Sequence, residues 1–242
     1  MELYEQIAKR KSTRKYLMDP LPKDLLSQIM SFTETLRPLI SGIRTEIQLA
    51  GAESVGSMFA VKAPHYLLIF SEPKEGYREN AGFLLQQVDL YLSSLGLGSC
   101  WLGMAKSKLE SPNGTEYVIM LGFGAASGSP HRTSLSDFTR KTLSEIAEGD
   151  DLRFEAARLA PSAGNTQPWF YRKTGDGIEV YRTKFGALKN AMYGVMNQID
   201  IGIGLCHMWL AGEHFGQPLV FTFGGRPSKD VPQGYTFVGQ IS

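Results

Sequence analysis

The sequence predicts a mixed α+β fold of two similar halves arranged around a central mixed or antiparallel sheet with flanking helices. Three observations lead to this fold class. Apolar residues change repeatedly between helical and strand spacing, the same order of elements begins again after about residue 138, and the two halves correspond at a nearly constant offset. We therefore expect one unit, 1–242, made of halves spanning about 1–125 and about 138–242.

The apolar pattern of the first half predicts two helices and two buried strands. Apolar side chains recur every three or four residues in the helical segments, and the strands are short continuous apolar runs. Gly96 is expected to end the second helix. The expected helices span 23–36 and 80–95, and the expected strands span 63–73 and 116–124.

The second half repeats this alternation of helices and strands. Its turn signal, Gly175-Asp176-Gly177, is typical of a hairpin loop between two strands. The expected helices span 143–160 and 197–216, the hairpin spans 169–182, and the last strands lie within 218–225 and 234–241.

The two long helices align without a gap, which indicates an internal duplication. Asn80, Gly82, Leu85, Leu90 and Gly96 lie 120 residues before Asp200, Gly202, Leu205, Leu210 and Gly216, and residues 118–122 lie 117 before 235–239. Glycine near a helix start costs helix propensity, so the glycines of both helices predict close approach of another helix. The alternative is a chance alignment of two amphipathic helices.

Composition limits the class of partner. The formal net charge is +1 with mixed signs, which predicts no nucleic-acid or membrane-surface partner and favours a small-molecule substrate. The sequence has no apolar run of about 20 residues and no signal-peptide pattern, so a cytoplasmic protein is expected. Cys100 and Cys206 are expected to be buried free thiols, and neither they nor the four histidines have metal-ligand spacing. No metal is expected.

The stretch AKRKSTRKY, residues 8–16, predicts an anion site. In an extended segment Arg10, Ser12 and Arg14 point to the same side, so that two guanidinium groups flank a hydroxyl. Such groups bind an anion or carbonyl oxygens. The alternative is a solvated basic surface.

The stretch LAPSAGNTQPWFYR, residues 159–172, predicts a polar loop after a helix. Pro161 ends helical geometry and Gly164 permits a turn. Ser162, Asn165 and Gln167 both donate and accept hydrogen bonds, and with the apolar surface of proline and tryptophan they would suit the edge of a planar heterocycle. The alternative is a capped loop in which Asn165 bonds the backbone.

Four stretches together resemble the nitroreductase family of FMN-dependent oxidoreductases. They are RKSTRKYLMDPLPKDLL, APSAGNTQPW, SSLGLGSCWLGM at 93–104, and LGFG followed by Arg140-Lys141. The resemblance covers most of the chain and implies a nitroreductase-type fold. One departure is that the Pro-Ser-Asn loop expected soon after the first signature appears instead in the second half.

This order is similar to a divergent branch in which two subunit-like halves are fused in one chain. In the family, the arginines and the Pro-Ser-Asn loop of one site come from different subunits. The resemblance therefore implies one flavin site per chain and a monomer that is a pseudo-dimer, with further oligomerisation left open.

The resemblance also implies the site residues and the activity. FMN would be bound by Arg10, Lys11, Ser12, Arg14, Leu102, Gly103, Met104, Arg140, Lys141, Pro161, Ser162, Ala163 and Asn165. No catalytic side chain is implied, because the flavin carries the chemistry. NADH or NADPH would reduce FMN, and a nitroaromatic, quinone or similar flat acceptor would reoxidise it by a ping-pong mechanism. The alternative is a flavin-binding or flavin-free homologue without turnover.

Overall fold

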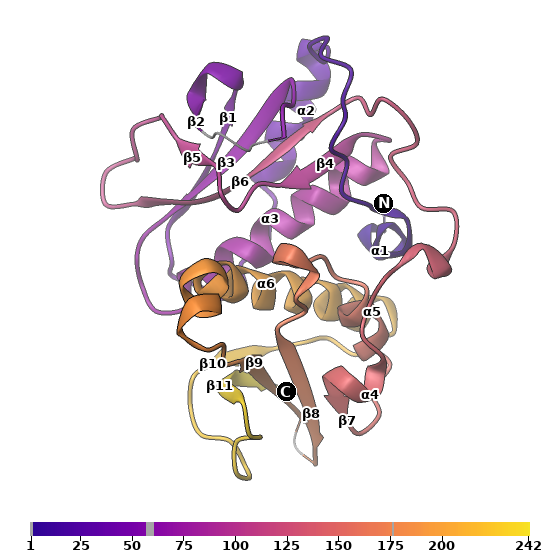
Figure 1. The fold of residues 1–242 in the computed structure, drawn as a ribbon, viewed down its shortest axis with the longest axis vertical. Helices are drawn as coiled ribbons and strands as arrows, with labels where there is room; N and C mark the ends of the chain where they lie inside the picture. The colour runs from indigo at the N-terminus through magenta and orange to yellow at the C-terminus, as the bar shows by residue number, and fades with distance from the viewer. Residues whose placement is uncertain (1, 57–60, 176) are drawn as a thin grey trace.

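The computed structural model describes residues 2–56, 61–175 and 177–242 and has an α+β fold with two separate main sheets (Figure 1). Helices α3 (Tyr77–Ser94) and α6 (Ala187–His214) pack against each other between these sheets. The prediction of one central sheet flanked by helices is therefore wrong. Every residue of α3 from Glu79 to Ser93 is buried, which requires cover on all sides of the helix, so a helix pair forms the central layer.

The first half contains a four-stranded antiparallel sheet in the order β1-β3-β6-β4. Its strands are β1 (Thr45–Ala50), β3 (His65–Ser71), β4 (Gly98–Trp101) and β6 (Glu116–Gly124). The other elements are η1 (Leu3–Glu5), α1 (Gln6–Lys9), α2 (Lys23–Thr33), η2 (Ala52–Ser54), the small pair β2 (Val55–Gly56) and β5 (Lys106–Ser107), and η3 (Leu135–Asp137). The expected helices and strands of this half are confirmed, whereas β1 and β4 were not predicted.

The second half contains a five-stranded sheet in the order β10-β11-β9-β8-β7, antiparallel except between β7 and β8. Its strands are β7 (Ala147–Glu148), β8 (Trp169–Thr174), β9 (Gly177–Thr183), β10 (Phe221–Phe223) and β11 (Tyr235–Ile241). The predicted hairpin is confirmed as β8–β9, and Asp176 at its centre lies outside the described residues.

Two helix predictions in the second half need correction. The segment 143–160 is not one helix but α4 (Leu143–Ile146), strand β7 and α5 (Phe154–Arg158). Gly149 has φ +84°, a left-handed conformation that interrupts the helix, and β7 pairs with β8. Helix α6 begins at Ala187 rather than at residue 197.

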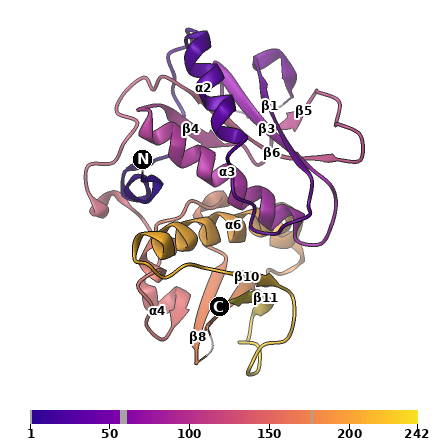
Figure 2. The ribbon, with the colours of Figure 1, turned by 180° about the vertical axis from the view of Figure 1, so that it is seen from behind.

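Helices α3 and α6 cross at two glycines, as the sequence predicted (Figure 2). A Cβ atom on Gly82 would overlap the carbonyl oxygen of Ile199. A Cβ atom on Gly202 would overlap the carbonyl oxygen of Glu79. The two backbones therefore approach more closely than any residue with a side chain would allow.

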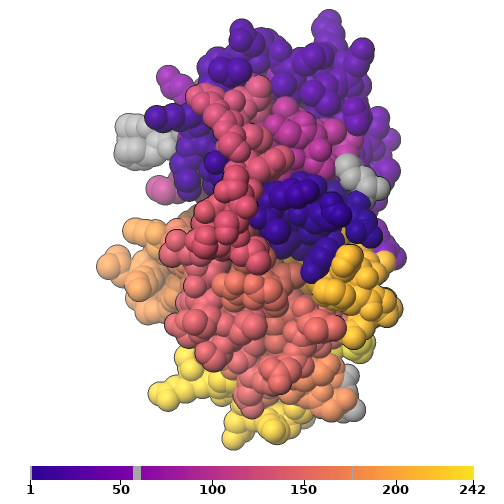
Figure 3. Space-filling view, turned by 90° about the vertical axis from the view of Figure 1, so that its right-hand side faces the viewer, coloured from indigo at the N-terminus to yellow at the C-terminus, as the bar shows by residue number. Residues whose placement is uncertain are grey.

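The segment that follows β6 crosses the surface from the first half to the second beside the N-terminal segment (Figure 3). Isolated bridges join Arg10 to His131 and Tyr16 to Ala126, while Ser12 pairs with Ser99 of β4. Residues 10–16 are therefore held extended at the junction of the two halves. None of the described helices has the length and apolarity needed to cross a membrane.

Candidate functional site

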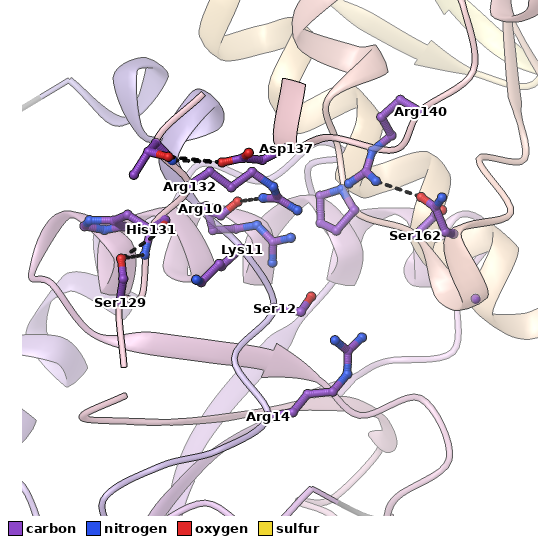
Figure 4. Close-up of a pocket in the computed structure, with 14 residues that line it drawn as sticks. Arg10, Lys11, Ser12, Arg14, Ser129, His131, Arg132, Asp137, Arg140 and Ser162 are labelled. Carbon is purple, nitrogen blue, oxygen red and sulfur yellow. Dashed lines mark hydrogen bonds between the residues drawn. The ribbon is translucent and has the colours of Figure 1, made fainter. Parts of the chain in front are cut away.

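Two adjoining cavities lie at this junction, with volumes of about 630 Å³ and about 270 Å³. We call the larger the first cavity and the smaller the second cavity. Both are lined by Ser12, Arg14, Pro161, Ser162 and Gly164. Stretches some 150 residues apart in the sequence therefore meet at one place, as Figure 4 shows for Ser12, Arg14 and Ser162.

Most of the predicted site residues line these cavities. Those at the first cavity are Arg10, Lys11, Ser12, Arg14, Arg140, Pro161, Ser162 and Asn165, and those at the second cavity alone are Gly103, Met104 and Ala163. Leu102 and Lys141 line neither. The Leu102 N–H donates to the Met120 carbonyl at 3.0 Å, and Lys141 Nζ donates to the Gln167 carbonyl at 3.0 Å, which holds both residues away from the cavities.

Arg10, Ser12 and Arg14 all line the first cavity, as predicted, and Lys11 between them lines it as well. They differ in burial, because Arg10 is only 3% exposed and Arg14 is exposed. The alternative of a solvated basic surface therefore does not hold for Arg10.

Arg10 is fixed by a buried carboxylate that the sequence analysis missed. Asp89 on α3 lies 3.1 Å from Arg10 Nη1 and also accepts hydrogen bonds from Ser99 Oγ and, at 3.2 Å, from Trp101 Nε1. Both partners of the ion pair are buried. Asp89 lies within the apolar helical pattern, where sequence offers no sign that it faces an arginine 79 residues away.

Four guanidinium groups line the first cavity, those of Arg10, Arg14, Arg132 and Arg140 (Figure 4). Arg132, which was not predicted, donates to the Arg10 carbonyl and lies 3.9 Å from the centre of the Phe138 ring. Burial and the Arg10 guanidinium lower the pKa of Arg132 to about 10. Burial, followed by Arg10 and Arg132, lowers the pKa of Arg140 to about 10. Arg132 and Arg140 therefore remain cationic at neutral pH, and the positive charge gathered at this cavity favours binding of an anion.

The loop after α5 contains η4 (Ala163–Asn165). The sequence left open whether this loop faces a ligand or is only capped by its own side chains, and different residues of the loop do each. Asn165 Nδ2 donates to the Thr139 carbonyl at 2.9 Å, and its Oδ1 accepts from Arg140 at 2.8 Å. The Gln167 amide likewise bonds to Lys141 N and to the Asn165 carbonyl. These two side chains cap the loop, as the alternative interpretation proposed.

Other loop residues face the cavities. Ser162 Oγ accepts from the Gln167 N–H at 2.9 Å and lines both cavities, so its hydroxyl hydrogen is available to a ligand. Trp169 was expected to offer apolar surface beside the loop, but it is fully buried on β8. The surface offered to a ligand therefore comes from Pro161, Ser162 and Ala163.

The second cavity is mainly apolar. Its remaining lining residues are Cys100, Trp101, Ile119, Tyr193, Met196, Ile199, Asp200 and Ile203. A Cβ atom on Gly103 would overlap Met196 Sδ, so glycine lets the strand end approach α6. Asp200 is 3% exposed, and both of its carboxylate oxygens lie 3.1 Å from the Ala163 nitrogen. Burial raises the pKa of Asp200 well above its usual range.

No described group of three or more His, Cys, Asp or Glu side chains is placed to hold a metal ion. Both cysteines are buried free thiols, as expected. Among the histidines, His207 is buried, and burial lowers its pKa to about 3.

The family model described as "Putative TM nitroreductase" matches residues 2–212. The chain belongs to this nitroreductase family. The match ends within α6 and spans every residue named above as a lining residue of either cavity.

Comparison with solved structures found the following similar proteins, of which the first, from Thermotoga maritima, supports the nitroreductase fold. A Thermotoga maritima protein described as a putative nitroreductase has 22% sequence identity and a TM-score of 0.67, with 93% of this chain and 91% of that chain covered. A nitroreductase family protein of Clostridium difficile 630 has 20% identity and a TM-score of 0.48 over 63% of this chain and 100% of its own. A Bacteroides fragilis nitroreductase with bound FMN has 17% identity and a TM-score of 0.43 over 52% and 89%. Comparison with curated protein sequences gave no match.

Proposed function

We propose that this protein binds FMN in the two adjoining cavities and uses it to pass reducing equivalents from NADH or NADPH to a small flat acceptor, such as a nitroaromatic or a quinone. The observation that carries the proposal is a guanidinium-lined cavity that continues directly into an apolar one. FMN has the same division, with a dianionic phosphate at one end and a flat ring at the other.

The residues present fit such a ligand. At the first cavity Lys11, Arg132 and Arg140 supply positive charge. Asp137 is the one carboxylate among its described lining residues, and this group already accepts hydrogen bonds from the N–H groups of Thr133 and Ser134. The excess of cations is the environment that a phosphate requires.

Each part of the site then has a distinct task. Arg10, Ser12 and Arg14 bind the phosphate, the ribityl chain and the pyrimidine carbonyl, with Ser12 and Arg14 at the passage between the cavities. Pro161, Ser162 and Ala163 would lie against the ring, and Gly103 and Met104, which line the same cavity, would also contact it. Asn165 orients Arg140, while Leu102 and Lys141 support the site from behind. When bound, FMN supplies the hydride chemistry and the protein supplies position and charge.

The fused arrangement of two halves belongs to the same proposal. Gly202 lies 120 residues after Gly82, and Ile199 lies 120 residues after Glu79. The contact of Gly82 with Ile199 is therefore the reciprocal of the contact of Gly202 with Glu79. Reciprocal contacts are the mark of a twofold interface. We infer an intramolecular pseudo-dimer that folds and binds flavin as a monomer. Sedimentation of the holoprotein at low micromolar concentration tests this, and a flavin held only by a dimer would contradict it.

Titration of apoprotein with FMN, followed by flavin fluorescence, tests the proposed function. Binding should saturate at about one FMN per chain, because the first cavity is where, among the described residues, the arginines meet the polar loop. Anaerobic NADH or NADPH should then bleach the flavin absorbance, and a quinone should restore it. Parallel double-reciprocal lines are expected, since reductant and acceptor would use the same face of the bound flavin in turn.

The outcomes separate the proposed activity from the alternative. A protein that does not bind FMN lacks the proposed function altogether. A protein that binds FMN but is bleached by neither nicotinamide is the flavin-binding homologue without turnover. Intersecting double-reciprocal lines would contradict a shared site for reductant and acceptor.

A further inference from the structure

Asp200 on α6 and Asn80 on α3 occupy equivalent positions in the two halves and make equivalent contacts. Asn80 Oδ1 accepts hydrogen bonds from the N–H groups of Leu39 and Ile40, at 2.9 and 3.0 Å. The Asp200 carboxylate accepts from the N–H of Ala163 at 3.1 Å. In each half the donor follows a Leu-x-Pro sequence, at 36–38 and at 159–161. Holding this loop therefore requires only a neutral carbonyl oxygen, which asparagine supplies.

A carboxyl group at position 200 is not required to hold the loop, because a neutral carbonyl oxygen would be enough. In the part of the chain that the structure describes, it has no cationic partner, and its one hydrogen bond is to Ala163. Burying a lone carboxylate is unfavourable, so burial raises its pKa and favours the neutral acid, which has an O–H to donate. Asp200 also lines the second cavity, whereas Asn80 lines neither cavity. The acid is present only in the half where a ligand would lie beside it.

The ionisable groups around Asp200 do not offer it a counter-ion. Arg14 and Cys100 line the same cavity on the side of the first half, and Tyr193 lies on α6 itself. On α3, Glu79 is paired with Arg182 at 3.4 Å. None of these groups forms an ion pair or hydrogen bond with the Asp200 carboxyl among the described residues, so beyond the Ala163 N–H the carboxyl can hydrogen-bond a ligand in the second cavity.

We propose that Asp200 is the acid of the second cavity, which donates a hydrogen bond to an oxygen of the bound acceptor and then supplies a proton to it. This inference rests on the proposed flavin-dependent function. For a quinone, the hydride brings two electrons and one proton. The Asp200 O–H gives the second proton to the resulting hydroquinone anion, and the carboxylate left behind regains a proton from water. The acceptors favoured by this arrangement carry a carbonyl or nitro oxygen.

The decisive variant is Asp200→Asn, which places at position 200 the residue that the chain already uses at position 80. It should keep the Ala163 hydrogen bond and the fold, and it should bind FMN with a Kd within about threefold of wild type. The asparagine side chain of the variant cannot donate a proton to the acceptor. Infrared difference spectra of apoprotein across pH should show, in wild type, a protonated-acid carbonyl band that is missing from the variant, independently of any activity. The band of Glu79, whose pKa is also raised by burial, should remain in both proteins.

Stopped-flow kinetics of the two half-reactions then test the role of the acid. Reduction of the flavin by NADH or NADPH should be unchanged in Asp200→Asn, while reoxidation by 1,4-benzoquinone should slow by about 100-fold, the scale of general acid catalysis. The wild-type reoxidation rate should fall as pH rises through the raised pKa of Asp200, and the variant rate should be independent of pH. Asn80→Asp is the matched control, since it adds a buried acid away from the cavities and should leave both rates unchanged.

The outcomes distinguish this inference from the proposed function. If neither protein binds FMN, the proposed function fails and the inference fails with it. If both bind FMN and reoxidise at equal rates with equal pH profiles, the function stands and the role of Asp200 is refuted. If the variant loses FMN affinity and both half-reactions slow together, Asp200 only supports the loop, which also refutes the inference.

Discussion

The crossing of α3 and α6 predicts that alanine at Gly202 destabilises the protein, although alanine is the better helix former. Replacing glycine by alanine inside a helix normally raises the free energy of unfolding by about 1 kcal/mol. At Gly202, however, the new Cβ would overlap the Glu79 carbonyl oxygen and lie 2.8 Å from the backbone nitrogen of Phe83. Backbone atoms of a packed helix cannot move aside as the end of a side chain can. We take the overpacking cost as about 3 kcal/mol, which leaves a net loss of about 2 kcal/mol.

Gly194 on the same helix supplies the matched control. A Cβ atom there would meet only side-chain atoms of Asn190, which is exposed and can rotate away. Gly194→Ala should therefore raise the free energy of unfolding by about 0.5–1 kcal/mol. Urea denaturation followed by circular dichroism measures both variants against wild type. A Gly202→Ala variant as stable as Gly194→Ala would refute the close backbone crossing.

Three further predictions concern charge. Asp89→Asn removes the carboxylate partner of buried Arg10 and should cost about 3–5 kcal/mol in urea denaturation, whereas a loss below about 1 kcal/mol would mean that the pair is solvated. Arg132→Ala should raise the Kd for FMN by about 10- to 100-fold in a fluorescence titration. The control is Arg226→Ala, at an exposed residue outside both cavities, which should not change the Kd. Equal affinities of the two variants would place the phosphate elsewhere. Above the usual aspartate pKa the unfolded chain releases the Asp200 proton, whereas the folded protein keeps it. The free energy of unfolding should therefore fall by about 1.4 kcal/mol per pH unit, from the usual aspartate pKa up to the raised one. Urea denaturation of Asp200→Asn across pH should lack this contribution.

Secondary structure was predicted well wherever local pattern decides it. The long apolar periodicity of α3, the continuous apolar runs of β3 and β6 and the Gly-x-Gly turn of the β8–β9 hairpin all depend on neighbouring residues. The prediction failed where distant pairing decides. Strand β1 alternates polar and apolar residues only from Glu46 to Leu49, and this short pattern was overlooked. Its pairing with β3 orders the whole strand, while the 143–160 pattern is divided because β7 pairs with β8.

The sequence by itself indicated most of the predicted residues that line the two cavities, because the arginine-serine alternation and the polar loop are local patterns. It also located the glycines of the helix crossing, since their cost in helix propensity needs a cause. Only the tertiary structure decided that a helix pair rather than a sheet forms the central layer, that Asp89 holds Arg10, and that Arg132 joins the cationic cluster. Each of these depends on contacts between residues far apart in the chain, and neither burial nor an ion partner can be read from neighbouring residues.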